Sequence, residues 1–354
     1  MLISLAQGIG RGWRAPVGRR GILAARSHEA MRVELAGFCD LQVNGFAGVD
    51  FNRPGLSDEQ LEAAGEALRR TGVTRFLPTL ITAPAEEFAA CARALVHWSG
   101  PAMLGIHAEG PYLSPTEARG VHPAKHIVPA SIEDFRRRQD AAKGRIVLVT
   151  LAPEVPGALT LVEHLARSGV RVAIGHSNAT PAQVRDAVRA GATLSTHLGN
   201  GCAPGLPRHP NLIWEQLAAD ELTACFIADG HHLPAATLKS MVRAKTPARS
   251  ALVTDATAGA AAPPGPYTLG RLAIERDGQG RVVLPGTEKL AGSALTLDQA
   301  VARAARATGL GLDEVAPMAS AIPAACVGAS AAGRVVAEWD AESFSLTVVR
   351  VDGA

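Results

Sequence analysis

The sequence predicts an α/β protein, a (β/α)8 barrel of the TIM type with a small β appendage formed by the chain ends. Eight short apolar runs alternate with helical stretches, which is the pattern of β/α units around a parallel sheet. Hydrophobic residues make up 47% of the chain but aromatic residues only 4%, a composition that suits parallel strands covered by helices. Eight alternations without a Gly-rich first turn favour a closed barrel over an open doubly wound sheet.

The expected barrel strands lie, in order, at residues 33–44, 75–81, 103–109, 145–153, 171–176, 192–198, 223–230 and 250–256. Capping residues mark helices between them. Ser57 precedes one helical run as an N-cap, and Pro181 occupies the first turn of another run that ends at Gly191.

The alternating β/α pattern ends after residue 256. We expect a β-hairpin from 267–274 and 281–284 through Asp277-Gly278, helices at 295–308 and 312–321, and two strands within 333–351. The barrel is therefore assigned to residues 31–330 and the β appendage to residues 331–354.

Residues 1–30 differ from the rest of the chain, because arginines are interspersed with glycines and no apolar stretch of a secretory signal is present. Met31 stands immediately before the first predicted strand. We expect this segment to be disordered or to derive from an upstream start site, with a transit-like peptide as the alternative.

Composition also limits the partners and the compartment. The formal net charge is +2, which gives no electrostatic reason to expect nucleic acid or an anionic membrane as a partner. No apolar run approaches the roughly 20 residues that cross a bilayer. The five scattered cysteines include no C-x-x-C pair, which fits a reducing cytoplasm.

Most of the predicted strands end in polar or titratable side chains. These are Gln42 and Asn44, His107 and Glu109, His176, His197 and Asn200, Asp229 and His232, and Asp255. In a β/α barrel the C-terminal ends of the strands form the active site. One histidine after an apolar run is more often a packed core residue. Six converging ends are not explained by packing, because buried polar groups cost free energy unless they are paired.

Histidine and carboxylate side chains at these ends predict a metal-dependent hydrolase. Two neutral imidazoles and one carboxylate are a common ligand set for a hydrolytic zinc or iron ion, and they leave a position open for water. The cation acidifies that water and polarises the scissile carbonyl. A second carboxylate must then accept the proton and return it to the leaving group. Asp255, at the end of the last strand, is placed for this role.

These segments resemble the N-acetylglucosamine-6-phosphate deacetylase family of the amidohydrolase superfamily. The first matching segment is Gly37-Phe38-Cys39-Asp40-Leu41-Gln42-Val43-Asn44-Gly45. The others follow in family order at residues 105–111 with 120–123, 151–154, 175–180, 196–200, 228–232, 252–257 and 290–296.

The resemblance implies one divalent metal ion, zinc or iron, with Glu109, His176 and His197 as its ligands and Asp255 as general acid and base. Many amidohydrolases carry two histidines after strand one and a lysine after strand four, which support two metals. Gln42 and Asn44 stand at the first place, and no lysine ends strand four, as in the single-metal branch. The implied reaction hydrolyses the N-acetyl group of N-acetylglucosamine 6-phosphate, giving glucosamine 6-phosphate and acetate. The implied assembly is a homodimer.

For the substrate, the resemblance implies contacts from Val121, His122, Asn200, Gly201, Arg208, His232, Ala291, Gly292 and Ser293. His232 is expected to hydrogen-bond the carbonyl or the sugar. Arg208 is expected to bind the phosphate, since a guanidinium fork fits a pair of phosphate oxygens. Without the family, a solvated loop charge explains Arg208 equally well.

Three departures from the family concern the substrate walls and the chain ends. The family usually has an aromatic residue and Ala-Met around Asn200, where this chain reads Leu198-Gly199-Asn200-Gly201-Cys202. No acidic residue follows Arg208, and both chain ends are reduced. The alternative substrate is therefore another N-acylated sugar or a small amide. The alternative class is a non-catalytic sugar-phosphate-binding protein.

Overall fold

The computed structural model describes residues 30–98 and 100–353, so the expectation for the N-terminal segment lies outside the described residues except at Ala30. Eight parallel strands form one sheet in the order β11-β10-β9-β8-β7-β6-β5-β2. Their bounds are β2 (Phe38–Val43), β5 (Val73–Ile81), β6 (Ile106–Glu109), β7 (Ile146–Leu151), β8 (Arg171–Ile174), β9 (Leu194–Ser195), β10 (Thr223–Phe226) and β11 (Ser250–Leu252). A parallel bridge between Val43 and Ala256 joins the last strand to the first. The predicted barrel is confirmed.

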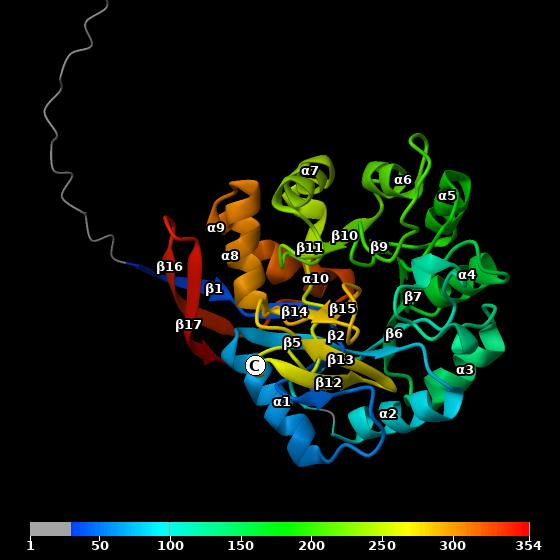
Figure 1. The fold of residues 1–354 in the computed structure, drawn as a ribbon, viewed down its shortest axis with the longest axis horizontal. Coiled ribbons are helices and arrows are strands. Elements are labelled where there is room, and N and C mark those ends of the chain that lie inside the picture. Colours follow the sequence, from blue (N-terminus) through cyan, green and yellow to red (C-terminus); the bar gives the residue numbers. More distant parts are fainter. Residues whose placement is uncertain (1–29, 99, 354) are drawn as a thin grey trace, which may run out of the picture.

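Helices surround these strands in Figure 1. They are α1 (Asp58–Arg70), α2 (Ala85–Trp98), α3 (Ile132–Ala141), α4 (Ala158–Arg167), α5 (Pro181–Ala190), α6 (Leu212–Ala218), α7 (Ala235–Lys245) and α8 (Leu297–Thr308). Ser57 caps α1 and Gly191 ends α5 in the left-handed conformation, as predicted. The single helix predicted at 312–321 is wrong. This segment instead forms α9 (Leu312–Val315), a 3₁₀ turn that contains Pro317, and α10 (Ala321–Cys326), because proline disfavours continuation of a helix.

The two chain ends meet in a three-stranded antiparallel sheet with the order β1-β16-β17. Its strands are β1 (Met31–Ala36), β16 (Arg334–Asp340) and β17 (Ser345–Asp352). The first predicted strand, 33–44, is thus two strands in different sheets, divided at Gly37. A Cβ atom at Gly37 would lie 2.1 Å from the Ala332 carbonyl oxygen, so this close backbone approach requires glycine.

A four-stranded antiparallel sheet lies at the barrel mouth, and we call it the mouth sheet. Its strands are β12 (Gly265–Leu269), β13 (Leu272–Arg276), β14 (Arg281–Val283) and β15 (Leu290–Ser293). The hairpin through Asp277-Gly278 joins β13 to β14 as predicted. The single strand predicted at 267–274 is wrong, because the chain reverses at Gly270, whose φ is +60°. A short hairpin of β3 (Gly45–Phe46) and β4 (Val49–Asp50) follows β2.

The mouth sheet has a hydrophobic cluster of its own. Leu269, Ile274, Val282 and Ala291 pack together with Ile81 of the barrel, apart from the main core. Asp50 ties the sheet to the barrel, because its carboxylate accepts hydrogen bonds from the Thr268 hydroxyl and the Gly270 amide, both at 2.8 Å.

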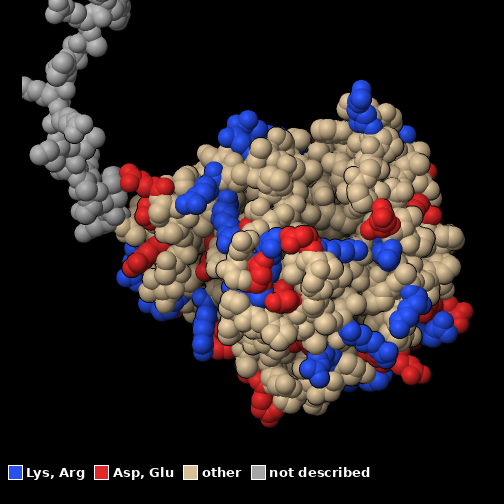
Figure 2. Space-filling model, in the orientation of Figure 1, with Lys and Arg blue, Asp and Glu red and all other residues tan. Residues whose placement is uncertain are grey.

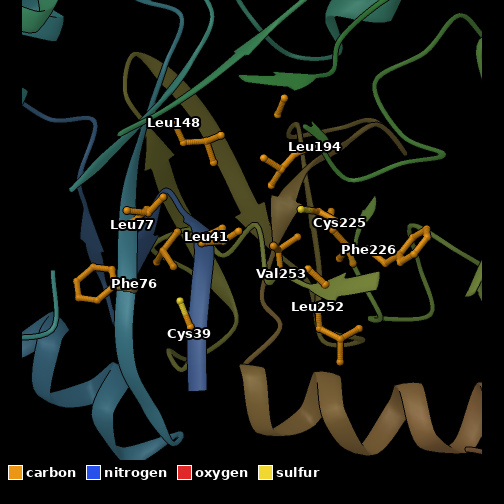
Figure 3. Packing of buried hydrophobic residues seen from close by; sticks show 14 of the residues in the cluster. Cys39, Leu41, Phe76, Leu77, Leu148, Leu194, Cys225, Phe226, Leu252 and Val253 are labelled. Atoms are coloured by element: carbon orange, nitrogen blue, oxygen red, sulfur yellow. The ribbon is translucent and has the colours of Figure 1, made fainter. Parts of the chain in front are cut away.

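Charged and apolar side chains are well separated. On the face shown in Figure 2, basic and acidic side chains are interspersed, in keeping with 35 Lys and Arg and 33 Asp and Glu in the sequence. Figure 3 shows core side chains contributed by strands around the barrel, among them Leu41, Leu77, Leu148 and Leu194. Within residues 30–98 and 100–353, no helix has the length and apolar character needed to cross a membrane.

Candidate active site

The three predicted ligand side chains converge at the C-terminal ends of β6, β8 and β9. Glu109 is the last residue of β6, and His176 and His197 follow β8 and β9 closely. The Nε2 atoms of His176 and His197 lie 3.1 and 3.2 Å from Glu109 Oε1 and 3.2 Å from each other. Ligand atoms about 2.0–2.1 Å from a tetrahedral zinc ion are separated by about 3.3 Å. The three side chains therefore have the spacing of one face of a metal coordination sphere.

Hydrogen bonding around these groups leaves lone pairs for a cation. His176 Nδ1 lies 3.1 Å from the Ala118 carbonyl oxygen, which can only accept, so Nδ1 carries the proton and Nε2 keeps its lone pair. Burial alone would raise the pKa of the Glu109 carboxyl. The adjacent imidazole rings of His176 and His197 outweigh this effect and hold that pKa well below its usual value. Glu109 is thus an anionic ligand group, and the donor set fits a divalent cation.

His122 is a further histidine beside this cluster. Ligand atoms of Glu109, His122 and His176 all lie within 4.8 Å of one another. The Thr82 amide, however, donates to His122 Nδ1 at 3.4 Å. The neutral ring then carries its proton on Nε2, which faces Glu109 Oε2 at 3.8 Å. Burial and the neighbouring His176 lower the pKa of His122 to about 3, so the ring stays neutral. This arrangement favours a hydrogen-bond donor over a fourth ligand.

Asp255 lies across from the ligand cluster, and two amide side chains hold its carboxylate. Asn44 Nδ2 donates to Asp255 Oδ1 at 2.6 Å, and Gln42 Nε2 donates to the same oxygen at 3.1 Å. Gln42 Nε2 also donates to Glu109 Oε1 at 2.9 Å, so one amide joins Asp255 to the ligand set. Burial, and then the charge of Glu109, raises the pKa of Asp255 to about 6. A carboxyl with that pKa can accept a proton and release it near neutral pH.

His232 completes the polar wall of the site. Its Nδ1 atom lies 2.7 Å from Asp229 Oδ2, and Asp229 Oδ1 accepts the His231 and His232 amides. Burial would raise the pKa of Asp229, but the hydrogen bond and charge of His232 lower it overall. Asp229 is therefore a carboxylate that fixes the ring orientation of His232, whose other nitrogen is left for a ligand.

One cavity brings together most of the residues predicted from the sequence. Those that line it are Glu109, Val121, His122, His176, His197, Asn200, Gly201, His232, Asp255 and Gly292. Ala291 and Ser293 are buried beside it, and the Ser293 hydroxyl donates to the Thr254 carbonyl oxygen. Arg208 is exposed on the loop after β9 and is not among the lining residues. Among the described residues that line the cavity there is no lysine or arginine.

Sequence reasoning gives no role to three residues of the site, Gln42, Asn44 and Asp229. Each stands at a strand end, which was the available signal. The sequence pattern indicates only that Gln42 and Asn44 replace metal-binding histidines. Their partner Asp255 lies more than 200 residues away along the chain, so the contact appears only in the fold.

No family model matches the chain. Comparison with known proteins nevertheless finds relatives that are named as deacetylases of amino-sugar phosphates. N-acetylglucosamine-6-phosphate deacetylase from Lysinibacillus sphaericus is 33% identical over 314 residues, which cover 87% of this chain and 80% of the relative. N-acetylgalactosamine-6-phosphate deacetylase from Escherichia coli O157:H7 is 34% identical over 297 residues, covering 82% and 77%.

A solved structure agrees in fold as well as in sequence. It is a mutant of N-acetyl-D-glucosamine-6-phosphate deacetylase from Mycobacterium smegmatis in complex with N-acetyl-D-glucosamine-6-phosphate. It superimposes with a TM-score of 0.83 at 30% identity, covering 90% of this chain and 86% of that chain. The resemblance predicted from the sequence is confirmed, and the chain belongs to the N-acetylglucosamine-6-phosphate deacetylase family of amidohydrolases.

Proposed function

We propose that this protein hydrolyses the N-acetyl group of N-acetylglucosamine 6-phosphate, giving glucosamine 6-phosphate and acetate. The observation that carries the proposal is the convergence of Glu109, His176, His197 and Asp255 in one cavity of a chain from this family. A non-catalytic sugar-phosphate-binding protein would have no use for Asp255 beside the ligand set, and the relatives are named as deacetylases.

Glu109, His176 and His197 would hold one divalent cation. When bound, the cation supplies Lewis acidity that polarises the amide carbonyl and acidifies the attacking water. Zinc, iron(II), cobalt and manganese all suit one carboxylate and two imidazoles, so the ligand set does not select among them.

The side chains of the site would carry the proton. Asp255 Oδ1 is occupied by the Asn44 and Gln42 amides, so Oδ2 accepts the proton of the attacking water. A C–O bond forms to the acetyl carbon, the C–N bond breaks, and Asp255 delivers the proton to the departing amine. Asp229 holds the His232 ring through Nδ1, so that Nε2 would face the carbonyl oxygen of the substrate.

The phosphate contact has two candidates. Arg208 is the family-based proposal, and its loop would have to bring the side chain towards Asn200. Lys289 is exposed beside the lining residue Leu290, and its Nζ atom donates to the carbonyl oxygen of the lining residue Gly120 at 2.9 Å. Arg208→Met and Lys289→Met test the two contacts separately. The variant that lowers kcat/KM for the phosphorylated sugar alone identifies the phosphate ligand.

Acetate release tests the function. We expect the protein to release acetate from N-acetylglucosamine 6-phosphate, and to do so much faster than from N-acetylglucosamine. Chelation should abolish the activity, and added zinc or iron(II) should restore it. Turnover that survives complete metal removal would exclude the proposed chemistry.

The second candidate substrate is N-acetylgalactosamine 6-phosphate, because the relative from Escherichia coli O157:H7 is named for it and the loop after Asn200 departs from the family. The ratio of kcat/KM for the two sugar phosphates decides between them. The proposal includes a homodimer, which light scattering can measure. It also includes a cytoplasmic location, since five scattered cysteines suit a reducing compartment.

A further inference from the structure

The barrel closes where β2 meets the end of β11, and regular strand pairing is replaced there by other contacts. The sheet order ends at these two strands. The backbone contributes the Val43–Ala256 bridge and a hydrogen bond from the Asn44 amide to the Ala256 carbonyl oxygen at 2.7 Å. Before Val43 in β2, the side chain of Asp40, and not a backbone carbonyl, accepts the hydrogen bond of the Thr254 amide.

Asp40 and Thr254 form a buried pair across this seam. The Thr254 hydroxyl donates to Asp40 Oδ2 at 2.6 Å, and the Thr254 amide donates to Asp40 Oδ1 at 3.2 Å. Asp40 is fully buried, and it is not among the residues that line the cavity. Burial raises the pKa of Asp40 to about 7, because the ionised carboxylate loses its hydration there. Its position is better explained by the residues that it holds than by contact with a substrate.

The residue held by this pair is Asp255. Its φ of +51° lies in the left-handed region, which is strained for a residue other than glycine and persists only where the surroundings enforce it. The flanking backbone is fixed on both sides. The Ala256 amide donates to Thr254 Oγ1 at 3.1 Å, and the Ser293 hydroxyl donates to the Thr254 carbonyl oxygen at 2.6 Å. Thr254 Oγ1 thus joins Asp40 to the peptide group that follows Asp255.

Asp40 also supports the side chains that contact the Asp255 carboxylate. Its Oδ1 atom accepts the Gln42 amide at 3.2 Å, and the Gln42 side chain donates to both Asp255 and Glu109. We infer that Asp40 and Thr254 are positioning residues that hold Asp255 in its strained conformation beside the metal ligands. The role of Asp255 as proton carrier rests on the proposed function. The inference that Asp40 and Thr254 hold its conformation does not.

Thr254→Val tests the pair, since valine keeps the shape of threonine and removes the hydroxyl. We expect kcat for acetate release to fall about 10- to 100-fold, because a displacement of about 1 Å costs about 100-fold in rate. KM should stay within about twofold and the metal content should not change. Thr254→Ser keeps the hydroxyl and should retain kcat within about threefold.

Thr308→Val is the matched control. Thr308 is buried, and its hydroxyl donates to the Ala304 carbonyl oxygen within α8, away from the cavity. This variant should lower the Tm and leave kcat unchanged. If Thr254→Val lowers the Tm in the same way and keeps kcat within about threefold of the parent, the pair only stabilises the barrel and the inference is wrong.

Crystal structures of the variants give a readout that does not depend on activity. In Thr254→Val we expect Asp255 to leave the left-handed region and its 2.6 Å contact with Asn44 to lengthen, with neither change in Thr254→Ser. An unchanged Asp255 would overturn the inference. If Thr254→Val does not fold, Asp40→Asn is measured in the same way. A parent protein that releases no acetate refutes the proposed function, and the structures still decide on the pair.

Discussion

Asn44→Ala removes the shortest hydrogen bond to the Asp255 carboxylate. The bond from Asn44 Nδ2 to Asp255 Oδ1 is 2.6 Å long and buried. A hydrogen bond to a charged group contributes about 1.5–3 kcal/mol. One pKa unit corresponds to about 1.36 kcal/mol, so loss of the bond should raise the pKa of Asp255, already about 6, by about 1–2 units. Only the ionised carboxylate accepts a proton, so activity is lost as the pH falls through this pKa.

The pH profile of kcat measures this shift. In Asn44→Ala, the acidic limb should move to higher pH by about 1–2 units relative to the parent, while bound metal stays constant. Ser57→Ala is the control, because it removes the hydroxyl that caps α1, and Ser57 is not among the residues that line the cavity. An acidic limb that stays in place while kcat falls equally at all pH values would show that Asn44 does not tune Asp255.

Three further outcomes are expected. Asp255→Asn should retain one metal per chain by metal analysis and lose about 100- to 10,000-fold in kcat, whereas loss of the metal would make Asp255 a ligand. Asp229→Asn removes the carboxylate from His232 Nδ1, so kcat should fall about 10- to 100-fold in steady-state assays, and a parental kcat would contradict the role given to this pair. Phe226→Ala in β10 deletes a fully buried ring and should lower the free energy of unfolding by about 3–5 kcal/mol in urea titrations, with a cost below 1 kcal/mol contradicting the packing described.

The sequence predicted the barrel because β/α units repeat a strong local pattern. It failed where two strands share one continuous apolar run. Residues on either side of Gly37 have similar strand character, and only the approach of Ala332 shows that they enter different sheets. Gly270 inside a strand pattern was a usable signal for a turn, since glycine in a strand often marks a bend.

The candidate site was predictable only in part. Strand ends identify which side chains reach the barrel mouth, and they brought Glu109, His176, His197 and Asp255 into one set. Their hydrogen-bond partners come from distant strands, so the roles of Gln42 and Asn44 depend on register and closure. The hydrogen-bonding state of His122 depends on Thr82, 40 residues earlier, which no spacing rule connects to it.

The mouth sheet and the barrel strands contribute different parts of the site. Leu269, Leu290 and Gly292 line the cavity from a sheet with its own hydrophobic cluster, whereas the ligand set is carried by the barrel strands. Substitutions at Leu269 or Leu290 can therefore reshape the entrance without touching the metal ligands, whereas Ser293 of the same sheet is bonded to the backbone beside Asp255. The sugar that the entrance accepts can thus change at these two positions while the side chains that break the amide bond keep their contacts.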